Sequence, residues 1–195
     1  MKKFFAIYVV LMALTIQYAE AGMLVEPYLG YDQSSMEVVT VGNVDASATN
    51  SGLDYGARAG YRFSQGMWLS AEYALGNGSV KPKDSAQEDA TYTKSAMSAV
   101  VGYDHDKFRL WLGYGVSDKL TFKDSTGTTN LSGTNYKLGF GFKPAAQFSV
   151  NLEYLVPSYT KFNNGGADAD VSTAFSKLNG ASTQLSLSMP FDLGK

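Results

Sequence analysis

The stretch SGLDYGARAGYRF, residues 51–63, alternates without a break between apolar side chains and polar or small ones. Its odd positions from Leu53 to Phe63 are apolar, whereas its even positions hold glycine, Asp54, Arg58 and Arg62. Successive side chains of a β-strand point to opposite faces, so a period of two predicts a strand. One face of this strand is apolar and the other is charged.

The same period recurs in seven further stretches, so the sequence predicts eight strands. The other stretches are residues 23–32, 67–76, 94–103, 108–117, 136–143, 148–157 and 181–191. Most of them have about ten residues, which is the length that crosses a bilayer at a tilt.

The predicted connections alternate between short and long. The short ones are residues 64–66, 104–107 and 144–147, and the long ones are residues 34–50, 77–93, 118–135 and 158–180. Four long loops without structure are unusual in a compact soluble domain, whereas outer-membrane barrels alternate short periplasmic turns with long extracellular loops. The predicted fold is therefore all-β: an eight-stranded antiparallel up-and-down transmembrane β-barrel with short periplasmic turns and four long extracellular loops.

Charge separates the two faces of the predicted strands. The apolar face has no charged residue, whereas the opposite face has eleven: Glu26, Asp32, Asp54, Arg58, Arg62, Glu72, Lys94, Arg109, Lys137, Lys143 and Glu153. A soluble sandwich or a lipocalin would also alternate. The charged face, however, holds ten glycines, which suit a cramped barrel interior better than a water-facing strand surface. We interpret the apolar face as lipid-facing and the charged face as the lining of a filled lumen.

The short turns predict the register of the strands that they join. The turn at residues 64–66 sets Arg58 opposite Glu72, and the turn at residues 144–147 sets Lys137 opposite Glu153. We predict that both are structural ion pairs inside the lumen. The other lumen charges are expected in the same paired network: Glu26, Asp54, Arg62, Lys94, Arg109 and Lys143.

Aromatic residues on the apolar face gather at the strand ends. Such belts mark the interfaces between membrane and water. The short-turn ends are predicted to carry the periplasmic girdle: Phe63, Tyr103, Phe108, Phe142, Phe148 and Phe191. The long-loop ends are expected to carry a second girdle: Tyr31, Tyr73, Tyr114, Tyr136 and Tyr154.

The first 21 residues have the pattern of a cleaved secretory signal peptide. Lys2 and Lys3 precede an uncharged run at residues 4–16, and Ala19 and Ala21 have the spacing of a signal-peptidase site. The run is too short to cross a bilayer as a helix. We therefore expect residues 22–195 to form the mature outer-membrane barrel.

The last predicted strand carries Leu185, Leu187, Met189 and Phe191 at alternate positions, and residues 192–195 follow it. This pattern resembles the C-terminal signal that the barrel-assembly machinery reads. Together with the eight strands, it makes the chain similar to the small bacterial outer-membrane β-barrel family of eight-stranded OmpA-like, OmpX-like and OmpW-like proteins. The resemblance implies an integral protein of the cell outer membrane. Its implied partners are outer-membrane lipid, lipopolysaccharide and, during insertion, the assembly machinery.

Function is implied only coarsely, as a structural or surface-interaction role of a monomer in the cell envelope. A narrow channel for small or hydrophobic solutes is the alternative, favoured by inward apolar residues: Leu24, Trp68, Val100, Trp111 and Leu155. A lipid-modifying enzyme is the second alternative. Enzymes that resemble such barrels place catalytic His, Ser or Asp at the outer side, whereas His105, the one histidine of the sequence, lies in a predicted periplasmic turn. We therefore expect no enzymatic activity and no catalytic residue.

The amino-acid composition argues against several classes of ligand. The 195 residues include no cysteine, which excludes disulfides and cysteine-ligated metal sites. The net charge is -2 and 17% of the residues are charged, so the sequence lacks the excess of basic residues that binding to nucleic acid requires. No cofactor and no metal site are expected.

Overall fold

The computed structural model describes residues 22–41, 45–63, 65–83, 90–125, 127–145 and 147–193, and the expected signal peptide at residues 1–21 lies outside them. No helix in this part of the chain is long and apolar enough to cross a membrane. The described elements, in chain order, are β1 (Gly22–Thr40), β2 (Asp45–Arg62), β3 (Met67–Pro82), β4 (Ala90–Asp104), β5 (Phe108–Lys123), β6 (Thr128–Ala145), β7 (Phe148–Asn164), β8 (Ala169–Asp170), α2 (Val171–Ala174), β9 (Phe175–Ser188) and β10 (Phe191–Leu193).

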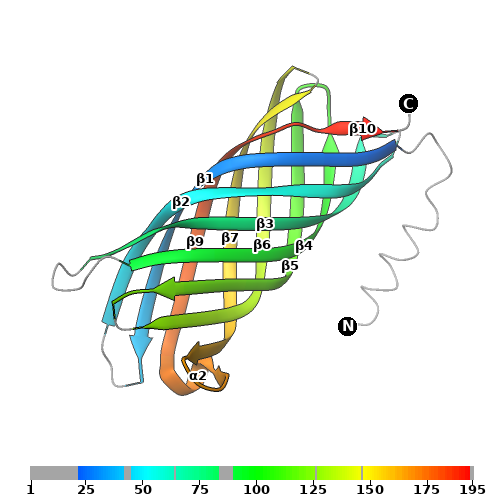
Figure 1. Cartoon of the computed structure of the whole chain (residues 1–195). Helices are drawn as coiled ribbons and strands as arrows, with labels where there is room; N and C mark the ends of the chain where they lie inside the picture. The colour runs from blue at the N-terminus through cyan, green and yellow to red at the C-terminus, as the bar shows by residue number, and fades with distance from the viewer. Residues whose placement is uncertain are drawn as a thin grey trace.

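Eight of these strands close a ring (Figure 1). Strands β1 to β7 each pair antiparallel with the next strand along the chain, and β9 pairs with both β7 and β1. The register followed around the ring from Leu24 returns to β1 at Ser34, a stagger of ten residues. Such a stagger tilts the strands and sets the barrel width. The predicted antiparallel up-and-down barrel is confirmed.

The strand count is ten rather than eight, for two local reasons. β9 ends at Ser188, and Pro190, which has no N–H for the ladder, separates it from β10. β10 continues beside β1, with Phe191 opposite Val25. β8 is a two-residue strand that pairs with β7 outside the ring. The ring itself keeps the predicted eight positions.

The prediction of four long loops is wrong for most of the residues concerned. Much of residues 34–50, 77–93, 118–135 and 158–180 continues as paired strand, so that β1 reaches Thr40 and β2 begins at Asp45. Outside a bilayer the outward side chains meet water and need not be apolar. Ser, Thr and Asn replace Leu and Tyr there, and the period-two pattern fades although the backbone ladder continues. The strands therefore extend beyond the apolar belt, and Figure 1 shows them as long, continuous arrows.

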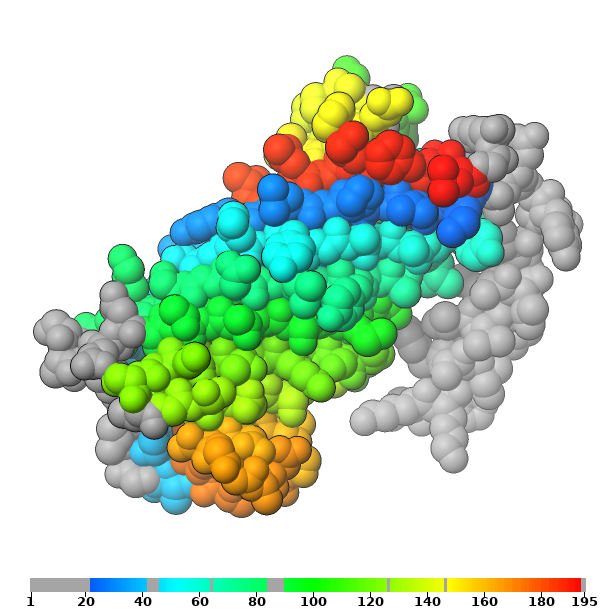
Figure 2. All heavy atoms as spheres, viewed as in Figure 1, coloured from blue at the N-terminus to red at the C-terminus, as the bar shows by residue number. Residues whose placement is uncertain are grey.

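The outward face carries the apolar belt. In the space-filling view, β1 to β5 form one continuous face, coloured from blue to light green (Figure 2). Leu112 and Leu152 expose 59% and 51% of their surface near mid-strand. Five predicted periplasmic-girdle residues are exposed and Phe63 is half-buried, and the Phe108 and Phe142 rings lie 5.7 Å apart. The five tyrosines of the expected second girdle are exposed as well.

Apolar side chains also fill parts of the interior. The short-turn end holds a buried cluster of Leu24, Trp68, Val100 and Trp111. The opposite end holds a second cluster, the upper apolar cluster, which consists of Val80, Tyr92, Leu120 and Leu131.

Glycine makes room for the tryptophan rings of the first cluster. Gly139 lies opposite Trp111, and a Cβ at Gly139 would stand 1.9 Å from Cε2 of that ring. Because the ring is buried among packed neighbours, Gly139→Ala is expected to destabilise the barrel by about 1–3 kcal/mol, the usual cost of overpacking. Urea midpoints of the refolded barrel measure this effect. Gly127→Ala is the control, since a Cβ there meets nothing within 4 Å; equal midpoints for the two variants would contradict the packing argument.

Candidate functional site

Arg58 lies at the centre of a charged network inside the barrel. It projects from β2, opposite Glu72 of β3, and is fully buried. Its Nε donates to Glu72 Oε2 at 2.7 Å, its Nη2 to Glu153 Oε1 at 2.5 Å and its Nη1 to Glu26 Oε1 at 3.4 Å. The Trp111 ring centroid lies 4.8 Å from Arg58 Cζ, within cation–π distance. One planar guanidinium thus serves three carboxylates and an aromatic face.

Two further cations complete the middle of the network. Arg109 of β5 donates from Nη1 and Nη2 to the two oxygens of Glu26, at 2.5 Å and 2.9 Å. This bidentate geometry is the strong form of a carboxylate pair. Lys137 of β6 donates to Glu72, and its Nζ lies 3.6 Å from Glu153 Oε2. Glu26, Glu72 and Glu153 therefore have two cationic neighbours each.

A second layer of pairs lies toward the short turns. Asp104 accepts hydrogen bonds from Arg62 Nη2 at 2.7 Å and from Trp68 Nε1 at 2.8 Å. Arg62 Nη1 also donates to Asp192 at 2.6 Å, which ties β2 to β10. Lys143 Nζ lies 3.9 Å from Asp104 Oδ2. These contacts join the two layers through Arg109, whose Nε is 3.2 Å from Asp104 Oδ1.

Acids and bases balance in this set, which we call the lumen network. Its five acids and five bases are Glu26, Glu72, Asp104, Glu153, Asp192, Arg58, Arg62, Arg109, Lys137 and Lys143. A buried charge is tolerated only where it is paired and hydrogen-bonded. Every member of the lumen network has an ion-pair partner, and the set carries no net charge.

The register between β6 and β7 differs from the expected one. Lys137 lies opposite Leu155 rather than Glu153, because the strands stay paired as far as Ala145 opposite Phe148, and the bulge between Phe142 and Ala145 then leaves Phe142 opposite Val150. Bulges of this kind add residues on one strand only, and alternation does not reveal them. Lys137 and Glu153 are diagonal neighbours instead of direct ones.

The remaining predicted lumen charges lie on the side of the lumen network away from the short turns. Lys94 Nζ is 3.8 Å from Asp54 Oδ2. In the same region, Asp32 accepts a hydrogen bond from Ser182. Asp118 accepts one from Asn135 Nδ2 at 2.7 Å. We call Asp32, Asp54, Asp118 and Lys94 the upper acidic tier.

Three interior acids were not predicted as lumen residues. Asp104 and Asp192 continue the inward alternation of their strands by one step, so strand parity is a signal that could have found both. Asp118 faces inward because the β5–β6 register shifts between Gly115 and Asp118. Nothing in the sequence marks that shift.

Clusters of three or more acidic, histidine or cysteine ligands for a metal are absent from the part of the chain that the structure describes. No three of its His, Cys, Asp and Glu residues could together hold a metal ion. His105 is exposed in the turn between β4 and β5, where its amide donates to Phe108 O at 2.7 Å.

Comparison with known proteins identifies the fold. No protein-family model and no curated protein matches the sequence. Ail, the attachment invasion locus protein of Yersinia pestis, crystallised in complex with the heparin analogue sucrose octasulfate, has a similar structure. Its TM-score is 0.58 at 14% identity, over 87% of this chain and 99% of that chain.

Two further outer-membrane proteins have similar structures. OprG from Pseudomonas aeruginosa has a TM-score of 0.52 at 16% identity, over 91% of this chain and 99% of that chain. AlkL, determined by solid-state NMR in DMPC lipid bilayers, has a TM-score of 0.52 at 13% identity, over 89% of this chain and 92% of that chain. The expected likeness to small outer-membrane β-barrels is confirmed for the fold.

Proposed function

We propose, from the premise that the chain is by fold an outer-membrane β-barrel, that the protein is a non-conducting barrel of the cell outer membrane with a structural or surface-interaction role. The observation that carries this proposal is the complete burial of Leu24, Glu26, Arg58 and Trp68 in the lumen. A water-filled path would expose such side chains. The lumen network and the cluster at the short-turn end occupy this space instead, as expected for a ring of eight strands.

The extended strands supply the surface for the proposed role. Above the second girdle, strand alternation places hydroxyl and amide side chains outward, among them Thr49, Ser51, Asn77, Thr93 and Asn130. These groups both donate and accept hydrogen bonds, so they suit the saccharide of lipopolysaccharide, while the apolar belt suits lipid. A sugar-like ligand on this fold has a precedent in Ail with sucrose octasulfate.

A narrow conduit for hydrophobic solutes is the second candidate. The upper apolar cluster favours it, because this cluster presents Val80, Leu120 and Leu131 to the interior. The lumen network, however, crosses the barrel between that cluster and the short turns. An enzymatic role receives no support, since the one histidine lies among the short turns, at the opposite end from the extended strands.

Planar-bilayer recordings test the non-conducting proposal. The wild-type barrel is expected to leave the membrane conductance at its baseline, because the lumen network blocks the path of ions. Replacing Arg58 and Glu72 together with Ala removes two central side chains and is expected to give measurable conductance, which shows that the assay detects an open barrel of this size. Stable conductance steps from the wild type would contradict the proposal and favour the conduit.

Liposomes test the saccharide surface. The barrel is expected to unfold at higher urea in liposomes that contain full-length lipopolysaccharide than in liposomes with lipopolysaccharide stripped of its saccharide. The expected difference comes from binding to the folded state alone. Equal midpoints in the two kinds of liposome would count against a saccharide partner.

A further inference from the structure

The two charged regions of the lumen differ in charge balance. The lumen network is neutral, whereas the upper acidic tier sets three carboxylates against Lys94 alone. Asp32, Asp54 and Asp118 are all buried, and within the described chain Lys94 is the one cation in ion-pair distance of any of them. The tier therefore holds two buried negative charges without a basic partner. Such charges require compensation by a cation or by protons.

Unpartnered oxygen atoms lie in the same region. Asn50 Oδ1, Asp54 Oδ1, Asp118 Oδ1 and Asn135 Oδ1 are buried and accept no hydrogen bond. All four side chains are more than nine-tenths buried. Gln184, which lies opposite Asp32, has a buried donor without a partner at Nε2. The tier has an excess of acceptor oxygens as well as of negative charge, and both suit a hard cation.

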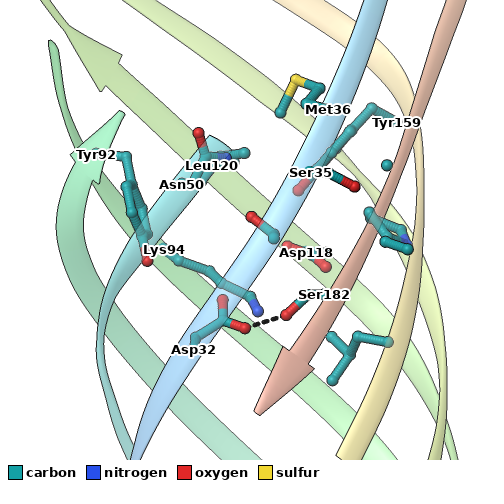
Figure 3. Close-up of a pocket in the computed structure, with 15 residues that line it drawn as sticks. Asp32, Ser35, Met36, Asn50, Tyr92, Lys94, Asp118, Leu120, Tyr159 and Ser182 are labelled. Atoms are coloured by element: carbon teal, nitrogen blue, oxygen red, sulfur yellow. Dashed lines mark hydrogen bonds between the residues drawn. The ribbon is translucent and has the colours of Figure 1, made fainter. Parts of the chain in front are cut away.

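A small cavity of about 30 Å³ lies among these groups. Asp32, Asn50, Lys94, Asp118 and Ser182 line it, and Figure 3 shows their side chains converging from β1, β2, β4, β5 and β9. A single water molecule requires about 10–15 Å³ of cavity volume when volume is measured in this way. The cavity therefore has room for one ion with about one water.

We propose that this cavity binds one divalent hard cation, Ca²⁺ or Mg²⁺, through the carboxylates of Asp32 and Asp118 and the amide oxygen of Asn50. The one water that the cavity also admits is a further ligand, and Lys94 stays beside Asp54. Two carboxylates with neutral oxygens and water form a donor set that both ions accept. The proposed site uses only two acidic ligands, so it is compatible with the lack of a cluster of three acids among the described residues. One divalent ion makes the tier neutral.

The proposed cation site goes beyond the proposed function, and it does not depend on whether the lumen conducts ions. Its three ligands come from β1, β2 and β5, where these strands extend toward the upper apolar cluster. A cation there links extended strands that the lipid belt does not hold.

The test uses the barrel refolded in detergent without lipopolysaccharide. Urea midpoints are measured in chelator and in rising CaCl₂ or MgCl₂, with NaCl holding the ionic strength constant. The wild-type midpoint is expected to rise with the divalent ion, because binding to the folded state alone stabilises it.

Two variants separate cation binding from relief of charge. Asp118→Asn keeps an oxygen for the Asn135 hydrogen bond and removes one charge. In chelator it is expected to be more stable than the wild type, and its apparent cation affinity is expected to fall at least tenfold. Asn50→Ala leaves the charge unchanged, so it is expected to weaken cation affinity without any gain of stability in chelator.

Glu37→Gln is the matched control, since Glu37 lies on the same strand as Asp32 but is exposed and pairs with Lys177. It is expected to keep the wild-type response. The proposal would be overturned if the wild-type urea midpoint did not change with divalent ions at constant ionic strength. It would also be overturned if the midpoint of Asp118→Asn rose with divalent ions as much as that of the wild type. A midpoint that responds to pH but not to divalent ions would show that protons neutralise the tier, and would also overturn it.

Discussion

Replacing Arg58 with Met is expected to destabilise the folded barrel by about 3–5 kcal/mol, the usual cost of leaving a buried charge without its partner. The Arg58 guanidinium contacts Glu26, Glu72 and Glu153, and all three carboxylates are buried. Without it the lumen network carries one unbalanced negative charge. Glu72→Gln is expected to destabilise the barrel by a similar amount. It leaves the lumen network with one unbalanced positive charge, because Arg58 and Lys137 both lose a carboxylate neighbour.

The double change Arg58→Met with Glu72→Gln is expected to cost far less than the two single changes added together. It leaves two balanced pairs in place: Arg109 with Glu26, and Lys137 with Glu153. Urea midpoints of the four proteins in liposomes form a double-mutant cycle that measures this coupling. Additive effects would show that Arg58 and Glu72 do not act as a pair.

An exposed pair supplies the control for this cycle. Lys161 Nζ lies 2.7 Å from Asp170 Oδ1, but both side chains are more than half exposed. Water and salt screen such pairs, so the same cycle at Lys161 and Asp170 is expected to show little coupling.

Leu112→Arg is expected to destabilise the barrel by about 2–4 kcal/mol, the cost of a cation on the lipid face near the bilayer centre. Leu112 points outward from the middle of β5 and is exposed, so in water the change would cost little. The large expected effect therefore depends on lipid and not on packing. Urea titration in liposomes measures it.

Thr128→Arg is the matched control for the lipid face. Thr128 is exposed at the start of β6, at the end of the barrel away from the short turns, where water surrounds the strand. Arg is expected to be tolerated there. Equal costs at positions 112 and 128 would contradict the membrane orientation of the barrel.

Local patterns predicted the membrane-facing part of the barrel well. Leu53, Tyr55 and Tyr61 alternate with inward residues along β2, and the structure exposes all three. The same alternation failed beyond the belt. Residues such as Ser47 and Thr49 continue β2. Their outward neighbours are polar, and a polar strand has no amphipathic signal.

Register was predictable only where a tight turn specified it. The turn before β3 includes Gly66, with φ +83°, and a hydrogen bond from Phe63 N to Met67 O closes it. That geometry placed Arg58 opposite Glu72. The β6–β7 connection has an irregular pairing, so the same reasoning placed Lys137 two residues away from its observed partner.

Alternation and turn position specify eight strands with one apolar face around a charged lumen. Both signals are readable in the amino-acid sequence because they act between neighbouring residues. Which charges meet depends on the closed barrel. Arg58 and Glu153 are 95 residues apart, and they touch across the lumen because ring closure and stagger bring β2 and β7 to the same level. The excess of acids in the upper tier likewise depends on a bulge that turns Asp118 inward, and such a bulge leaves no pattern in the residues around it.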